Sequence, residues 1–447
     1  MKKYLLATLI AFCAIVSSLT AAPDLDQIRF EDYIYVDYVK SIRFNDGTSQ
    51  YSDPITKLGR RLYLSFDDLA TDEYRFNYMV IHCDRDWNPS DIDPLEYMRG
   101  FNYAEMDNGG EQSRFTKVDY WHYQLALPNT EVSWTLSGNY LLLVYDQEDN
   151  PVFTRRFVIY EGLGKLESQR GMTIGVGEKN TSQRIETTYR ELPETFIEEM
   201  HQSSLELRTM QNLDWSTMSD GFRPIRYQGE EYMFNKAEFP SFSSLQDFRQ
   251  ADTRGLEFTG TNLLEVDRGM DSIFALLKLD EPKRRNLGMS EFDINGRYYI
   301  DRRDASELEN LNGDNDTGST IVEVDYELSD RVYAEYVWTV FSVNALWLRK
   351  DAPTFVIGGF SDYKLYPEYA LSYDAERDIY IGAALMKQGR YDFHFVQIVD
   401  DKMDYSLTEK YEEQSTQDYR TFVYYRGFGD EYDRVLNSAF LNVNRGL

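Results

Sequence analysis

The densest group of chemically active side chains is the run His82-Cys83-Asp84-Arg85-Asp86-Trp87-Asn88-Pro89-Ser90. Read as an active site, it offers a thiol, an imidazole and two carboxylates. However, His82 and Cys83 are adjacent in an expected strand, so their side chains point to opposite faces and cannot pair as base and nucleophile. We therefore expect a strand followed by an Asx-type turn, with His82 or Cys83 buried and Trp87 packed over it.

Two acidic runs resemble calcium loops in composition only. Residues 84–88 place oxygen side chains at alternate positions, but Pro89 replaces the required glycine and Leu95 stands where a glutamate is needed. The run Asp314-Asn315-Asp316 has no glutamate in register downstream, so we expect a solvated loop. The chain has four His and no His-x-x-x-His spacing, which leaves a zinc site without support. We predict no metal and no cofactor.

Other catalytic signatures are also missing. The sequence has no Gly-x-Ser-x-Gly motif, no Walker loop and no Gly-x-Gly-x-x-Gly after an expected strand. Carboxylate pairs leave no sequence signature, so this alone does not exclude an enzyme. Because nothing positively supports one, we predict a protein that is not an enzyme.

The composition restricts the class of partner. The 447 residues include 76 Asp and Glu but 47 Lys and Arg, a net charge of −29. Such a chain repels phosphate backbones, so nucleic-acid binding is not expected. Aromatic residues make up 15% of the chain, with 35 Tyr, and this favours strands, where flat rings pack across a pleated sheet.

The first residues have the pattern of a secretion signal. Lys2 and Lys3 precede an apolar run from Leu5 to Val16, which is too short to span a bilayer and is followed by small residues. We place the signal at residues 1–21, with cleavage after Ala21. Removing it reduces 47 basic residues to 45, moves the net charge from −29 to −31, and leaves Cys83 as the sole thiol.

Short bursts of alternating apolar and polar residues, separated by turn signals, recur along the rest of the chain. The clearest are Tyr33 to Val39, Arg61 to Phe66, Arg75 to His82, Tyr140 to Asp146, Val152 to Tyr160, Thr354 to Ile357, Ile379 to Ala383, Tyr391 to Ile398 and Arg420 to Tyr425. We therefore predict an all-β fold of serial immunoglobulin-like β-sandwich domains. Their expected ranges are 24–161, 178–330 and 331–436.

A series of longer phrases resembles one family along nearly the whole mature chain. The phrases are YRFNYMVIHCDRDWNPSDIDPLEYMRGF (74–101), SGNYLLLVYDQEDNPVFTRRFVIYE (137–161), LMKQGRYDFHFV (385–396) and VYYRGFGDEYDRV (423–435). Their order and spacing are similar to those of the plug protein family of the type IX secretion system. The family-motif residues, which we expect to be structural, are His82, Cys83, Asp84, Trp87, Tyr97, Gly138, Tyr140, Arg155, Arg156, Gly389, Tyr425, Arg426, Tyr432 and Asp433.

The resemblance implies a non-catalytic periplasmic accessory that binds and seals the periplasmic opening of the outer-membrane translocon barrel. It implies attachment to the outer membrane through protein contacts, and the sequence indicates no small-molecule ligand. The alternative is an exported carbohydrate-binding or glycan-processing β-sandwich protein. That alternative depends on Phe355 to Asp362 (FVIGGFSD), which resembles early-set sandwiches of the glycogen-binding type, with Tyr363 near the sugar-stacking position of those modules.

Overall fold

The computed structural model describes residues 23–70, 72–106, 109–173, 180–192, 204–257, 262–283, 293–303 and 331–443. The expected signal at 1–21 and the Asp314-Asn315-Asp316 run lie outside these residues. Strands dominate the described chain, and the helices are single turns, so the all-β prediction is confirmed. No helix among the described residues is long and apolar enough to cross a membrane.

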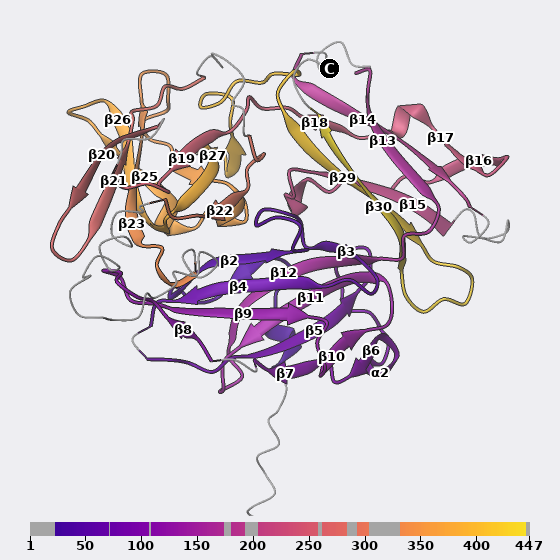
Figure 1. Cartoon of the computed structure of the whole chain (residues 1–447). Helices are drawn as coiled ribbons and strands as arrows, with labels where there is room; N and C mark the ends of the chain where they lie inside the picture. The colour runs from indigo at the N-terminus through magenta and orange to yellow at the C-terminus, as the bar shows by residue number, and fades with distance from the viewer. Residues whose placement is uncertain are drawn as a thin grey trace, which may run out of the picture.

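The first unit is a sandwich of two antiparallel sheets at the bottom of Figure 1. One sheet has the order β1 (Tyr33–Ile34), β12 (Pro151–Tyr160), β11 (Gly138–Tyr145), β5 (Asn77–Cys83) and β7 (Tyr103–Glu105), with β3 (Ile55–Lys57) parallel to β12. The other has the order β2 (Val39–Asn45), β4 (Leu62–Asp68), β9 (Trp121–Leu127) and β8 (Glu111–Gln112). A β10–β6 ribbon (Val132–Trp134 and Met98–Gly100), the helix α2 (Pro94–Tyr97) and the 3-10 turn η1 (Leu25–Gln27) complete it.

The apolar run Tyr140 to Tyr145 in strand β11 does not alternate with polar residues, because both faces of this strand are covered. All eight of its residues are buried. Tyr140, Leu142 and Val144 face the main core between the sheets, whereas Leu141 and Leu143 face a smaller cluster on the outer side. A strand covered on both faces reads as a continuous apolar run.

The second unit joins segments far apart in the sequence, at the right of Figure 1. One sheet contains β13 (Lys165–Gly171), β14 (Ser182–Arg190), β17 (Glu231–Phe234), β16 (Pro224–Gln228) and β18 (Ser241–Ser243). The other has the order β15 (Leu205–Gln211), β29 (Gln417–Tyr425) and β30 (Arg434–Val443). The 3-10 turns η3 (Trp215–Thr217) and η4 (Lys236–Glu238) lie in its connections.

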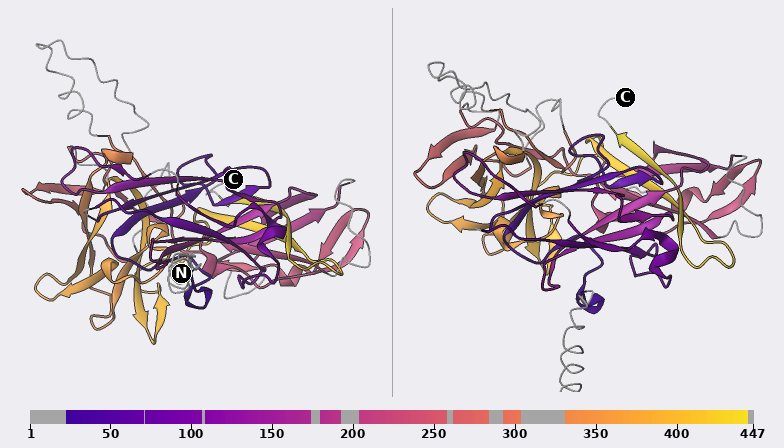
Figure 2. Two further views of the ribbon diagram at one scale, coloured as in Figure 1. Left: turned by 90° about the horizontal axis from the view of Figure 1, so that it is seen from below. Right: turned by 60° about the horizontal axis from the view of Figure 1, so that its bottom comes forward.

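The third unit is one curved sheet wrapped around its own core, at the left of Figure 1. Its order is β19 (Arg249–Asp252), β27 (Gly389–Val399), β24 (Thr354–Ile357), β25 (Ala370–Asp374), β26 (Ile379–Lys387), β23 (Tyr336–Asn344), β21 (Ile273–Leu277) and β20 (Leu263–Arg268). Strands β22 (Tyr298–Ile300) and β28 (Lys402–Asp404) also pair with β27, and η5 (Gly359–Ser361) and η6 (Pro367–Tyr369) follow β24. The views in Figure 2 agree that the first unit underlies both others.

The strand pairing corrects the expected division of the second half. The range 178–330 is not a separate domain, because β15 pairs with β29, while β19 and β22 pair with β27. The second and third units therefore interleave across the expected boundary at residue 331. Period-two patterns identify strands but carry no information about which distant strand completes a sheet. The expected strand from Tyr33 to Val39 is also interrupted, because β1 ends at Ile34 and β2 begins at Val39.

Candidate functional site

The turn that follows β5 is built around the carboxylate of Asp84. Its Oδ1 atom accepts hydrogen bonds from the backbone amides of Asp86 and Asn88, each at 2.9 Å. Trp87 has φ +67°, a left-handed conformation that tight turns use. The structure thus places an Asx-type turn here, with the Asp84 oxygen engaged by the chain's own amides.

His82 and Cys83 lie on opposite faces of β5 and are both buried. His82 Nδ1 is 2.8 Å from Ser90 Oγ, and its Nε2 is 3.2 Å from the carbonyl oxygen of Ser137. Burial lowers the pKa of His82 to about 4 and raises the pKa of the Cys83 thiol. At neutral pH the imidazole is uncharged and the thiol is protonated, so the two do not form a nucleophile and base.

Aromatic rings and a glycine enclose His82. The ring centroids of Tyr97, Tyr140 and Tyr432 lie 5.6, 4.8 and 5.5 Å from that of the imidazole. A Cβ on Gly138, whose φ is +148°, would lie 2.2 Å from His82 Nε2. Five family-motif residues from three separate sequence phrases therefore meet at one packing site.

The same turn connects the first unit to the second through ion pairs, whose acidic partners Glu206 and Asp433 are buried. Arg85 donates from its backbone amide and its guanidinium to Asp433, and its Nη1 is 3.1 Å from Glu206 Oε2. Arg208 in turn lies 2.7 Å from both Asp86 Oδ1 and Glu206 Oε1. Burial alone would raise the pKa of Asp433, but the hydrogen bonds and charge of Arg85 hold it below its usual value.

Two tryptophans and an arginine extend this contact. Trp87 of the first unit and Trp215 of η3 in the second meet edge to face, with centroids 5.0 Å apart. The Arg156 guanidinium carbon lies 5.3 Å from the Trp87 centroid and 5.2 Å from that of Trp215. Trp87 also packs against the small core that holds Cys83. The predicted motif run is thus a junction between units.

Four predicted residues have other surroundings. Tyr425 lies in the core of the second unit, and Arg426 donates to two carbonyl oxygens in the β29–β30 turn. A Cβ on Gly389 would lie 2.4 Å from a backbone oxygen of the neighbouring strand β22. Arg155 Nη1 lies 3.3 Å from Asp362 Oδ2 and joins the first unit to the third.

The sequence reasoning missed a buried ion network that joins all three units. Asp53 of the first unit accepts from Arg297 Nη2 of the third at 2.7 Å and from Arg420 Nη2 of the second at 2.8 Å. Arg297 also forms an ion pair with Asp418 of the second unit. Burial alone would raise the pKa of Asp53, but the charges of Arg297 and Arg420 lower it.

A second buried network joins the first unit to the third. Lys387 Nζ and the Tyr336 hydroxyl each lie 2.7 Å from Asp67 Oδ2. Lys387 Nζ also lies 4.0 Å from the Tyr120 ring centroid. Burial alone would raise the pKa of Asp67, but Lys387 and His122 lower it to about 2. In the sequence, Lys387 only marks the end of the apolar strand β26, so nothing there indicated a buried ion pair.

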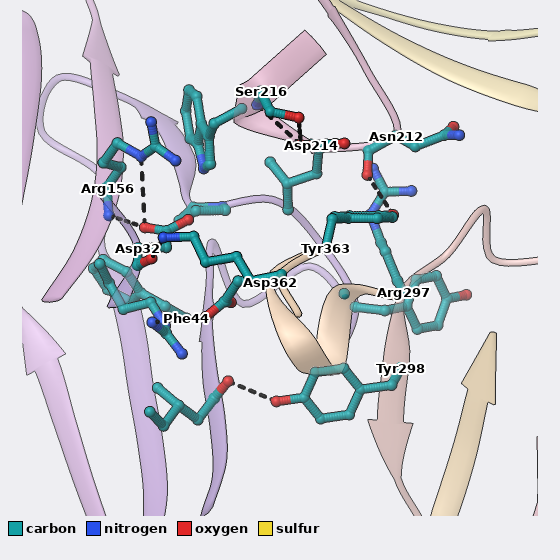
Figure 3. A pocket seen from close by; sticks show the side chains of 18 of the residues that line it. Asp32, Phe44, Arg156, Asn212, Asp214, Ser216, Arg297, Tyr298, Asp362 and Tyr363 are labelled. Carbon is teal, nitrogen blue, oxygen red and sulfur yellow. Dashed lines mark hydrogen bonds and ion pairs between the residues drawn. The ribbon is translucent and has the colours of Figure 1, made fainter. Parts of the chain in front are cut away.

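A cavity of about 550 Å³ lies where the three units meet (Figure 3). The first unit contributes Asp32, Ile42, Arg43, Phe44, Arg155 and Arg156, the second Asn212 to Thr217, and the third Arg297, Tyr298, Asp362, Tyr363, Lys364 and Tyr405. Arg156 and Asp32 face each other on one side of the labelled group, and Tyr363 and Arg297 lie on the other. The wall of the cavity thus combines aromatic rings with basic side chains, which donate hydrogen bonds, and acidic side chains, which accept them.

Two turns with unusual backbone geometry form part of this wall. Asn212 and Leu213 have φ of +52° and +58°, and Asp362 and Tyr363 have φ of +52° and +55°. The Tyr363 hydroxyl donates to the Asn212 carbonyl oxygen at 3.1 Å and holds the turns together. The sequence suggested Tyr363 as a sugar-stacking residue, and the structure places it in this wall between two units.

Comparison with known proteins adds the family. A family profile described as "Type 9 secretion system plug protein 1st domain" matches residues 39–161, most of the first unit. No curated protein sequence matches the chain.

Solved structures extend the likeness in fold. A hypothetical protein from Parabacteroides merdae superposes with a TM-score of 0.78 at 21% identity, over 93% of this chain and 100% of that one. At this identity the likeness shows the fold alone. The alignments with E. coli alpha-2-macroglobulin (9% identity, 95% of this chain, 23% of that one) and a biofilm-associated protein BSP domain (9%, 95% and 85%) have TM-scores of 0.18 and 0.16, too low to carry an argument.

The predicted resemblance is confirmed for the first unit. This family is a secretion-system plug type and not a known enzyme family. Residues 39–161 therefore match the first domain of the type 9 secretion system plug protein family, and this match suggests a role associated with that secretion machinery in the cell envelope.

Proposed function

We propose that this protein is a non-catalytic periplasmic accessory of the type 9 secretion system. It binds the outer-membrane translocon barrel and seals the barrel's periplasmic opening. The observation that carries the proposal is the plug-family first domain at residues 39–161. The expected signal at 1–21 supplies export, and protein contacts hold the molecule at the outer membrane.

The architecture supports an occluding role for physical reasons. A plug must keep its shape when it closes an opening, and three separately mobile domains would deform. Here buried ion pairs join the first unit to the second through Arg85, to the third through Lys387, and to both through Asp53. Breaking a buried pair leaves an uncompensated charge in a low-dielectric interior, so these joints resist opening.

The surroundings of the motif residues support a binding role rather than a catalytic one. The best candidate for chemistry, His82 with Cys83, is buried, uncharged and divided between two faces of a strand. Sealing a barrel requires surface complementarity and no reactive group.

The test has a biochemical arm and a cellular arm. After mild detergent extraction, affinity purification of the tagged protein is expected to recover the translocon barrel. Deleting the gene in a strain that retains the barrel is expected to increase influx of small polar antibiotics, and a plasmid copy is expected to restore resistance. A strain lacking both proteins is the control, because removing the barrel removes the leak. Failure to recover the barrel, together with unchanged influx, refutes the proposal.

A further inference from the structure

We propose that the cavity where the three units meet binds a neutral saccharide of one or two rings. Its volume of about 550 Å³ lies within the range of roughly 300–1,000 Å³ that small-molecule sites occupy. All three units contribute to its wall, so the site exists only in the assembled molecule. Such junctions between domains are frequent locations for ligand sites.

Three buried polar atoms of the wall lack hydrogen-bond partners among the described residues. They are Arg43 Nε, Arg156 Nε and Asp362 Oδ2. Arg156 Nε lies 3.8 Å from the Asp32 carboxylate, which is too long for a hydrogen bond, and Asp362 Oδ2 lies 3.3 Å from Arg155 Nη1 without suitable geometry. Buried polar atoms are nearly always paired. These three atoms have almost no accessible surface, so a ligand in the cavity pairs with them once the side chains rotate towards it.

The mixture of unpaired donors and acceptor selects the chemistry of the ligand. A carboxylate or a fully ionised phosphate ester accepts from the guanidinium groups but cannot donate to the Asp362 carboxylate, and a hydrogen phosphate would bring a negative charge next to it. An ammonium group donates but cannot accept. A hydroxyl does both, so a molecule that carries several hydroxyls can satisfy all three positions.

The charges of the wall favour a neutral molecule. Its five basic residues stand against four acidic ones, and most are already engaged. Arg297 is bound by Asp53 and Asp418, and Lys364 lies 2.7 Å from Glu31 Oε2. A ligand with a large net charge would therefore find no excess of the opposite sign.

The apolar part of the wall fits the carbon faces of sugar rings. Phe44, Trp215, Tyr298 and Tyr363 come from all three units and supply large flat surfaces. Aromatic side chains combine such contact area with a polar edge, which suits a ligand whose faces are apolar and whose rim is polar.

The backbone supplies an independent indication of a functional site. Two turns of the wall, 212–213 and 362–363, each hold two consecutive non-glycine residues at positive φ. Such conformations cost free energy and cluster at ligand-binding and active sites, where the surrounding structure holds them. The hydrogen bond from Tyr363 to Asn212 fixes one turn against the other.

The test measures the binding of sugars to the purified mature chain. Calorimetry and the fluorescence of Trp215 and its neighbours report the binding. The probes are glucose, galactose, mannose, N-acetylglucosamine and the α-1,4- and β-1,4-linked glucose disaccharides, at up to about 10 mM. Asp362→Asn keeps the size and suits a left-handed position, and it is expected to weaken binding at least about tenfold. Asp378→Asn is the matched control, because Asp378 is also left-handed (φ +54°) but lies outside the cavity wall.

A second variant protects the test against a folding defect. Met403 lines the cavity and is 40% exposed, so Met403→Trp reduces the space in the cavity without disturbing a core and is expected to weaken binding as well. Absence of binding by every sugar overturns the proposal. Binding that both variants retain places the site elsewhere and overturns it too, and binding of phosphate or short peptides alone overturns the ligand class. None of these results depends on whether the protein docks on the barrel.

Discussion

Replacing Lys387 by methionine tests whether buried ion pairs hold the units together. Lys387 and Asp67 are each about 1% exposed, and their charged atoms are 2.7 Å apart. Lys387→Met keeps the length and apolar volume of the side chain but leaves the Asp67 carboxylate buried without its cation. Removing one partner of a buried pair costs about 3–5 kcal/mol.

The pKa of Asp67 gives a second measure of the same interaction. Lys387 and His122 lower it from 3.8 to about 2, against the effect of burial. For a carboxyl that is fully buried, this difference corresponds to roughly 2–3 kcal/mol of folding stability, shared between Lys387 and His122. A depressed carboxyl pKa stabilises the fold above pH 3.8, and the contribution is lost as the pH falls towards 2. The stability difference between wild type and Lys387→Met is therefore expected to shrink over that interval.

The matched control is an exposed pair of the same kind. Lys350 lies 2.6 Å from Asp378, but these side chains are 51% and 40% exposed. Lys350→Met is expected to leave the unfolding midpoint nearly unchanged, since water and salt screen exposed pairs. Urea titration at pH 7, followed by circular dichroism and tryptophan fluorescence, measures both variants, with midpoints compared because three units need not unfold in one step. Equal losses for the two variants would refute the reasoning.

Three further outcomes are expected. Gly138→Ala should lower the free energy of unfolding by about 1–3 kcal/mol, because the new Cβ would lie 2.2 Å from His82 Nε2. The control is Gly59→Ala, where φ is +87° but no atom lies within 4 Å of the new Cβ. Thermal melting should show a smaller loss of stability for this control. Cys83, buried and with a raised pKa, should react with a maleimide only once denaturant opens the fold, and mass spectrometry of the native protein should find it unlabelled. The full chain has a net charge of −29, so its affinity for the translocon barrel should fall as salt rises from about 50 to 500 mM if charge steers docking. Surface plasmon resonance measures this affinity, and an unchanged value would assign the contact to apolar groups.

Local pattern predicted the strands well and their partners badly. The bursts around β4, β5, β12 and β27 lie within a few residues of the observed strands. Runs rich in β-branched and aromatic residues between turn signals identify strands even where both faces are buried, as in β5 and β27. The pairing of β15 with β29 joins residues more than 200 positions apart, and nothing in either segment specifies the other. The expected boundary at residue 331 failed for this reason.

For the candidate sites too, features set by local strand geometry were predictable, and features assembled from distant segments were not. That His82 and Cys83 point to opposite faces followed from strand geometry, and the structure agrees. The cavity was beyond prediction, because its polar wall assembles from positions such as Arg156, Asp214 and Asp362, each unremarkable in its own segment. The buried cations left no clear signal either, since Lys387 is the last residue of the apolar strand β26, where a solvated lysine is common, and its anionic partner lies 320 residues away.

The location of the motif residues bears on what the family's first domain is. The profile covers residues 39–161, yet the partners of the turn after β5 are Glu206, Arg208 and Asp433, all outside that range. A domain selected to fold alone would not carry an Arg85 that is only 14% exposed and pairs with carboxylates elsewhere in the chain. Buried charges of the first domain are compensated by the other two units, so these ion pairs form only in the assembled three-unit body. If that body seals an opening, the motif acts at a distance, by fixing the shape of the surface that docks rather than by forming it.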